Sequence, residues 1–107
     1  MTRKDRDIER VTRLLRRDIA TTLGPEHEAI VDQLAAIVLE LDILGVTEKV
    51  VEDVQQYFQD NFVDVTWPAC PRHPNHPLEF RPDVWYCPRD GLTVAPLGEL
   101  NSASQNG

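Results

Sequence analysis

The sequence predicts an α+β fold that is mainly α-helical, with a three-helix N-terminal unit followed by a small C-terminal β-hairpin. Apolar residues recur at helical spacing over the first 60 positions. Six prolines then fall between residues 68 and 88, and such a density excludes a helix there. Both cysteines of the chain lie in the same segment. The predicted units are therefore residues 1–61 for the helices, 62–100 for the hairpin segment and 101–107 for a polar tail expected to be disordered.

The first predicted helix covers residues 7–23 and is strongly amphipathic. Its apolar sector consists of Ile8, Val11, Leu15 and Ile19. A stripe of arginines occupies the opposite side: Arg3, Arg6, Arg10, Arg13 and Arg17. Gly24 suits the left-handed position after a helix end, and Pro25 suits the first turn of the next helix, so the break is expected there.

The second predicted helix, residues 26–44, is the most apolar part of the chain. Its apolar residues are Ile30, Val31, Leu34, Ile37, Val38, Leu39, Leu41, Ile43 and Leu44. A helix that is apolar over so much of its circumference is expected to be central and packed by neighbours on more than one side.

A third helix is predicted over residues 47–60, with Thr47 as its N-cap after Gly45. Val51, Val54 and Phe58 fall on one face of this helix. Three helices joined by short turns favour an antiparallel bundle.

The chain changes character after Asn61. Residues 61–67 alternate apolar and polar side chains, as a short strand does. Further β-like pieces are predicted at residues 78–80, 84–86 and 92–94, and turn-forming residues at 81–83 and 90–91 connect them. The sequence therefore predicts a hairpin between residues 78 and 86.

Charge is distributed unevenly along a chain whose net charge is −7. Residues 1–17 carry seven basic and three acidic side chains, whereas residues 18–64 carry eleven acids and the single cation Lys49. No run of 18 apolar residues predicts a membrane span, and the N-terminal stretch lacks the apolar core of a signal peptide. A cytoplasmic protein is expected, in which cysteines more often bind metal than pair as disulfides.

The Cys-Pro-Arg frame occurs twice, as CPRH at residues 70–73 and as CPRD at residues 87–90. Cys70, His73 and His76 are each separated by two residues, and Cys87 and Asp90 follow. Structural zinc takes four thiolate, imidazole or carboxylate ligands, usually delivered as two closely spaced pairs. The doubled frame therefore predicts a Zn²⁺ site.

These residues resemble the zinc-ribbon group, in which two CPxCG-like knuckles flank a β-hairpin. The resemblance covers residues 67–97 and implies a metal-clamped hairpin at residues 78–86. It matches Cys70 and Cys87 to the leading cysteine of each knuckle, and His73 and Asp90 to the second ligand of each. Gly91 matches the glycine that closes a knuckle with positive φ. The segment WPACPRHPNHPL at residues 67–78 also resembles stretches of small bacterial proteins, which implies no activity.

The fourth ligand is open between His76 and Asp90. Pro74 stands where the first knuckle would have its glycine, and proline cannot adopt positive φ, so the first loop departs from the standard knuckle. Two thiolates and two neutral imidazoles around Zn²⁺ sum to zero charge, whereas Asp90 in place of one imidazole leaves −1. The predicted ligands are therefore Cys70, His73, His76 and Cys87, with Asp90 as a turn residue or an acceptor for a histidine N–H.

Four alternatives compete with a structural zinc site. The first is a metal-free loop packed by Trp67, Phe80, Trp85 and Tyr86, and the second is a Cys70–Cys87 disulfide. A Rieske-type iron–sulfur centre is disfavoured because Asp90 stands where that site needs histidine. A catalytic metal would leave one coordination position open, with Asp90 or Glu79 as general base. The segment has no hydrolase or phosphate-binding motif, so no enzymatic activity is expected.

The arginine stripe suggests contact with nucleic acid phosphates or with a partner protein. A sequence pI of about 4.8 disfavours nucleic acid. Pairing of the stripe with the acidic second and third helices, or simple solvation, is the favoured explanation of the stripe. The expected function is a non-enzymatic, zinc-binding interaction or regulatory module that has a protein partner or forms a homo-oligomer. Nucleic-acid binding is the first alternative, and a metal-dependent hydrolase is the second.

Overall fold

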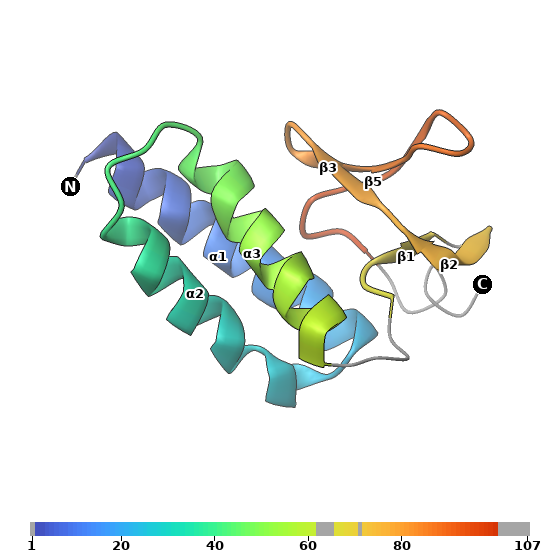
Figure 1. The fold of residues 1–107 in the computed structure, drawn as a ribbon, viewed down its shortest axis with the longest axis horizontal. Helices are drawn as coiled ribbons and strands as arrows, with labels where there is room; N and C mark the ends of the chain where they lie inside the picture. The colour runs from blue at the N-terminus through green and yellow to red at the C-terminus, as the bar shows by residue number, and fades with distance from the viewer. Residues whose placement is uncertain (1, 62–65, 71, 101–107) are drawn as a thin grey trace.

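The computed structural model describes residues 2–61, 66–70 and 72–100 (Figure 1). The helices are α1 (Arg3–Thr22), α2 (Ala29–Leu39) and α3 (Val46–Asn61), with a short 3-10 turn η1 (Pro25–His27) before α2. Strands β1 (Ala69–Cys70) and β2 (His73–Pro77) form one antiparallel sheet, and β3 (Glu79–Arg81), β4 (Val84–Cys87) and β5 (Leu92–Pro96) form a second. Three helices with two small sheets confirm the predicted α+β class.

Helix α1 begins earlier than its apolar periodicity predicts. Thr2 and Asp5 form a capping box: the Thr2 side chain accepts a hydrogen bond from the Asp5 N–H, and the Asp5 carboxylate accepts one from the Thr2 N–H. These bonds satisfy donors that the helix start leaves without intrahelical partners. The four predicted apolar positions of α1 are all buried: Ile8, Val11, Leu15 and Ile19.

Helix α2 is shorter than predicted, and the expectation that it is the central helix is wrong. It packs against α1 and α3 on the side away from the strands, while α1 and α3 lie between it and the β unit (Figure 1). The α2 helix ends at Leu39, and the Lys4 ammonium donates a hydrogen bond to the Leu41 carbonyl just beyond. Ile37 is 58% exposed and Leu44 is 98% exposed, so the apolar excess of this segment faces solvent.

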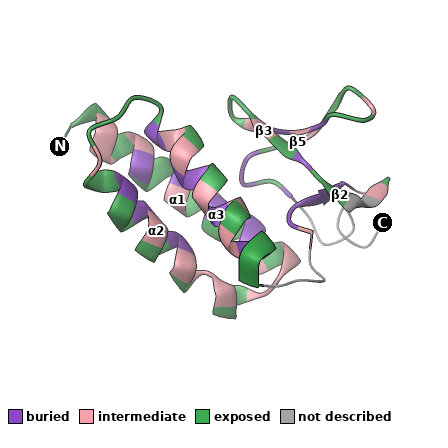
Figure 2. Ribbon diagram, in the orientation of Figure 1, coloured by how far each residue is buried: buried purple, intermediate pink, exposed green. Residues whose placement is uncertain are grey.

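Helix α3 completes the bundle and confirms the predicted face of Val51, Val54 and Phe58, all of which are buried. Figure 2 shows the buried residues gathered where the helices face one another. The bundle core is built largely from β-branched and aliphatic side chains, whose burial is the main stabilising contribution in this part of the molecule.

The C-terminal part confirms the predicted hairpin and adds to it. β3 and β4 pair antiparallel, with Phe80 opposite Trp85, and β5 adds a third strand next to β4. Asp83 adopts φ 63° in the tight turn after Pro82, the conformation that such a two-residue turn requires. The small β1–β2 sheet was not predicted, because its segment is rich in proline.

A row of aromatic rings joins the helices to the β unit. Ring centroids of Phe58 and Trp67 are 5.5 Å apart, those of Trp67 and Trp85 are 5.6 Å apart, and Phe80 lies 6.0 Å from Trp85. The Trp67 indole N–H also donates to the Thr22 hydroxyl over 2.9 Å. One hydrophobic cluster thus runs through both parts of the molecule.

Two predictions fall largely outside the described residues. The strand expected over residues 61–67 lies mostly on residues 62–65, and the tail predicted to be disordered is residues 101–107. Among the helices that the structure describes, none combines the length and apolar character that crossing a bilayer requires.

Candidate metal centre

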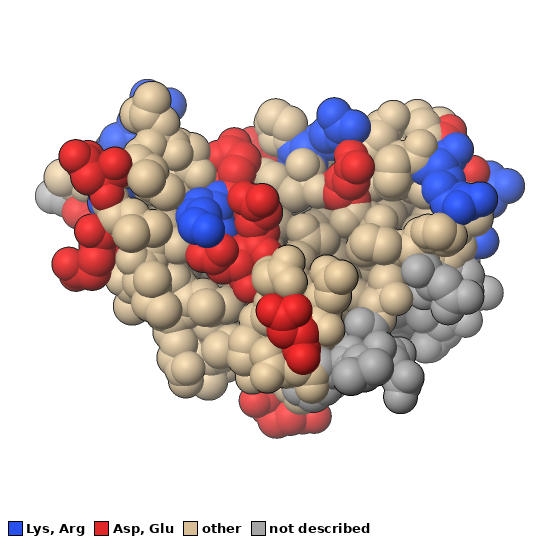
Figure 3. Space-filling model, viewed as in Figure 1, with Lys and Arg blue, Asp and Glu red and all other residues tan. Residues whose placement is uncertain are grey.

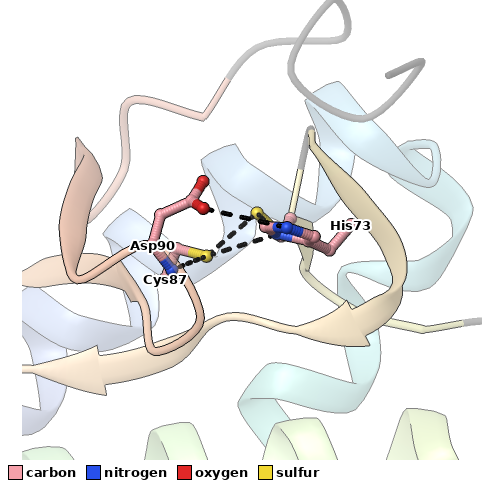
Figure 4. A group of neighbouring side chains, drawn as sticks. His73, Cys87 and Asp90 are labelled. Atoms are coloured by element: carbon pink, nitrogen blue, oxygen red, sulfur yellow. Dashed lines mark hydrogen bonds and ion pairs between the residues drawn. The ribbon is translucent and has the colours of Figure 1, made fainter.

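The two Cys-Pro-Arg loops meet at one place, although seventeen positions separate their cysteines in the chain. Cys70 ends β1 and His73 begins β2, so the first loop is the tight connection between these strands. Cys87 ends β4, and Asp90 lies in the turn that leads to β5. Each pair is therefore held by a hairpin turn, and the two turns face each other (Figure 4).

Four side chains from these turns point toward a common centre: Cys70, His73, Cys87 and Asp90. Their ligand atoms all lie within 4.8 Å of one another. The two sulfurs are 3.2 Å apart, and Nδ1 of His73 is 3.5 Å from the Cys70 sulfur and 3.7 Å from the Cys87 sulfur. Asp90 Oδ1 lies 3.8 Å from Nε2 of His73.

These separations fit one tetrahedral metal ion. Two sulfurs at about 2.3 Å from zinc lie about 3.8 Å apart, and a sulfur and a nitrogen about 3.6 Å apart, in tetrahedral geometry. The sulfur–nitrogen distances match this geometry, whereas the two sulfurs, 3.2 Å apart, are about 0.6 Å closer than it requires. Both cysteines are free thiols, and their sulfurs are far beyond the bond length of about 2.05 Å that a disulfide requires.

The backbone of each loop favours thiolate at its cysteine. The pKa of Cys70 is raised by burial and by the hydrogen bond of its thiol to Cys87. The backbone N–H groups of Arg72 and His73 act in the opposite direction, because they stabilise the Cys70 thiolate. The pKa of Cys87 is lowered: burial opposes the shift, but the N–H of Asp90, the Cys70 thiol and the N–H of Arg89 all stabilise the thiolate. The first proton to leave the pair is therefore that of Cys87.

The second loop closes as the zinc-knuckle resemblance implies. Gly91 has φ +68°, and its N–H donates to the Cys87 carbonyl over 2.9 Å. The Asp90 N–H lies 3.4 Å from the Cys87 sulfur, in the position that a knuckle uses to orient its thiolate. A glycine is needed here because positive φ is strained for residues with a Cβ.

His76, predicted as the fourth ligand, lies outside this group. Cys70 pairs with His73 and Ala69 pairs with Pro77. Residues 74–76 therefore have no pairing partner on β1 and form a β-bulge. The bulge exposes His76, and its Nε2 lies 2.9 Å from Nη1 of Arg89. The fourth residue of the group is Asp90, whose Oδ1 faces Nε2 of His73 while the sulfurs face Nδ1. The ligand role of His76 stays a prediction that a metal measurement has to test.

The arginines of the two loops supply positive charge close to the site, and that of Arg72 favours the Asp90 carboxylate as a metal ligand. Arg72 Nη1 lies 3.4 Å from Asp90 Oδ2, so the first loop reaches across to the carboxylate of the second. Arg89 of the second loop reaches His76, which follows the first loop. A site of two thiolates, one imidazole and one carboxylate around Zn²⁺ carries −1, and the neighbouring guanidinium of Arg72 offsets that charge.

Two members of the predicted arginine stripe form ion pairs within the chain. Arg10 forms a 2.8 Å ion pair with Asp83 in the β3–β4 turn, which fastens α1 to the β unit, and Arg3 lies 4.0 Å from Asp7. All five members of the stripe are exposed: Arg3, Arg6, Arg10, Arg13 and Arg17. The two ion pairs involve a β turn and α1 itself and not the acidic second and third helices, and the contact role of the stripe stays a prediction.

Asp18 is a structurally central residue that the sequence analysis missed. It is fully buried in α1, and its carboxylate accepts hydrogen bonds from the Trp85 indole and from the backbone N–H groups of Gly98 and Leu100, at 2.8, 2.8 and 2.9 Å. Burial raises the pKa of Asp18, although the three hydrogen bonds act in the opposite direction and lower it. The available signal was its angular position, since Asp18 falls beside Val11 at the edge of the apolar sector of the helix.

Comparison with known proteins yields no match, whether to a family model, a curated protein or a solved structure. Function therefore has to be inferred from the geometry of the site itself.

Proposed function

We propose that this protein is a non-enzymatic interaction module in which one Zn²⁺ ion, bound by Cys70, His73, Cys87 and Asp90, clamps the β unit. The observation that carries the proposal is the convergence of two hairpin turns on a group of four ligand atoms within 4.8 Å. Two thiolates and an imidazole are donors that suit zinc, which takes them in tetrahedral geometry.

A structural role suits the surroundings of the site. Cys70 is 2% exposed and Cys87 is 1% exposed, and both belong to the hydrophobic cluster that continues into the helices. Four protein donors close a tetrahedral site, which is the arrangement of structural rather than catalytic zinc. The degenerate zinc-ribbon resemblance of residues 67–97 agrees with this role.

The proposal includes a protein partner and the cytoplasm as compartment. Apolar side chains exposed near the end of α2 and in the connection to α3 favour association with protein over nucleic acid, most clearly Ile37 and Leu44. A reducing compartment keeps both thiols available for metal, whereas an oxidising one would favour their pairing as a disulfide.

The test is the metal content of untagged protein by elemental mass spectrometry, with Cys70→Ser, Asp90→Asn and His76→Ala as variants. We expect about one zinc per chain, lost in the Cys70 variant, weakened in the Asp90 variant and retained in the His76 variant. Cobalt substitution adds a readout of coordination number. If His76→Ala loses zinc while Asp90→Asn keeps it, the fourth ligand is His76, and intact protein without metal would refute the clamp altogether.

A further inference from the structure

A groove of about 780 Å³ runs between α3 and the β unit. One wall is a stripe of polar side chains along α3: Glu48, Glu52, Gln55, Gln56 and Gln59. The other wall is β3 with the residues before it, and Trp67 and Leu78, both buried, line the groove between the two walls. The groove is separate from the metal ligands, none of which lines it.

Strand β3 presents its free edge to this groove. It is an outer strand of its sheet, with β4 on the other side. Leu78, just before β3, directs both backbone groups away from β4: its N–H donates to the Pro68 carbonyl over 2.8 Å, and its C=O accepts from Gln55 Nε2 over 3.0 Å. By strand alternation, the N–H and C=O of Phe80 face the same way and are directed into the groove.

The helical wall is acidic where it faces this edge. Glu48 and Glu52 are exposed and one turn apart on α3, and among the described residues neither forms an ion pair within 4 Å. The cation between them in sequence, Lys49, is bound by Asp53 over 2.9 Å. Figure 3 shows acidic side chains gathered over α3 on the face toward the β unit.

We propose that this groove binds an extended, basic peptide segment of a partner protein, which adds to β3 as a further strand. The Phe80 backbone supplies the main-chain hydrogen bonds of strand addition. Glu48 and Glu52 supply the charge complementarity that selects lysine or arginine side chains on the incoming strand. The net charge of −7 draws such a segment toward the molecule. This inference rests on the proposed role as an interaction module and names the chemistry of the partner.

The test uses fluorescence anisotropy of a labelled nine-residue probe peptide (alternating lysine and valine) with the full chain, whose zinc content is measured on the same sample. The double variant Glu48→Lys/Glu52→Lys is expected to weaken binding by about tenfold or more, because both salt bridges become repulsive. The matched control is Glu26→Lys/Glu40→Lys, which makes the same charge change at exposed positions outside the groove and is expected to bind nearly as tightly as the unmodified chain.

Strand pairing is tested with a probe of the same sequence N-methylated at alternate residues, which removes main-chain donors on one edge and is expected to abolish binding. Equal weakening in both double variants would overturn the proposal, since binding would then reflect net charge alone. Failure of every lysine–valine probe would overturn it as well. If zinc-loaded protein does not bind the peptide, the peptide-binding proposal is refuted and the zinc site is retained. If protein without zinc binds the peptide, the zinc site is refuted and the peptide-binding proposal is retained.

Discussion

The helical unit and the β unit of this molecule differ in the interactions that stabilise each of them internally. The three helices bury a continuous set of aliphatic side chains, and fully buried valines dominate it. The β unit has short strands of two to five residues, and its interior contains Trp85, Leu78 and the two cysteines. Isolated small sheets of this kind are marginal in water. Apolar burial is extensive in the first unit, whereas the second adds to a smaller apolar interior the Asp18 hydrogen bonds and, under the proposed function, a bound metal ion.

Removing the metal is expected to have the largest effect on the difference in stability between the two units. In Cys87→Ser, or after chelation, the β unit should lose its packing while the helices persist, because metal-binding free energy is folding free energy for such a segment. Near-UV circular dichroism follows the packing of Trp67 and Trp85, and far-UV circular dichroism follows the helices. If both signals fall together, the two units unfold as one, and the helices are not stable independently of the β unit.

A cavity in the helical core is expected to have the next largest effect. Leu15 is fully buried, so Leu15→Ala should lower the free energy of unfolding by about 2–5 kcal/mol. Ile37→Ala is the matched control, since a side chain that is 58% exposed should change stability by no more than about 0.5 kcal/mol. Urea unfolding followed by circular dichroism measures both. Equal losses would mean that Ile37 is covered in solution by another surface.

The contact between the two units can be probed at glycines with positive φ. A Cβ at Gly98 (φ +88°) would lie 2.6 Å from Cδ2 of Leu14, whereas at Gly91 (φ +68°) the nearest atom, the Tyr86 hydroxyl oxygen, is 3.6 Å away. Left-handed backbone costs about 1–2 kcal/mol in either alanine variant. Overpacking adds about 1–3 kcal/mol at Gly98 alone. Thermal or urea unfolding should therefore rank Gly98→Ala as the less stable variant, and the opposite ranking would contradict the close approach of this segment to α1.

Asp18→Asn is expected to cost about 1–3 kcal/mol, because one amide oxygen cannot replace two carboxylate oxygens for three N–H donors. Since the pKa of Asp18 is raised in the folded state, its protonation stabilises the fold. That contribution is complete below the ordinary aspartate pKa and is lost as pH rises through the raised pKa. The stability difference between the two proteins should thus shrink with rising pH in urea titrations. A difference that grows with pH would show that the pKa is lowered instead.

Features that depend on local sequence were predictable, and those that depend on distant contacts were not. The apolar periodicity of α1 and α3 is a local signal, and it located both helices. Helix α2 ends at Leu39, before the predicted end at Leu44, and the apolar composition of the segment carries no signal for that end. The burial of α2 was misjudged for the same reason, since nothing in its own residues shows which side the β unit covers.

Three residues of the candidate metal site were predictable from the sequence, and the choice of a fourth between His76 and Asp90 stays a prediction for a metal measurement to test. The spacing of Cys70, His73 and Cys87 follows from two short loops, and these residues do converge. The preference for His76 over Asp90 came from a charge balance that omitted Arg72. The proximity of Arg72 to Asp90 becomes apparent only when the two loops face each other. The bulge that carries His76 outward likewise depends on a pairing register that the sequence does not display.

The hydrogen bonds of Asp18 also set an order of events during biosynthesis. Its backbone partners, Gly98 and Leu100, follow it by 80 and 82 residues. At synthesis rates of about 5–20 residues per second, a ribosome needs about 4–16 s to make that stretch. Helices form in microseconds or less, so α1 exists long before its carboxylate has these donors. Throughout that interval the nascent helix carries, at the edge of its apolar face, a carboxylate whose backbone hydrogen-bond donors have not yet been synthesised.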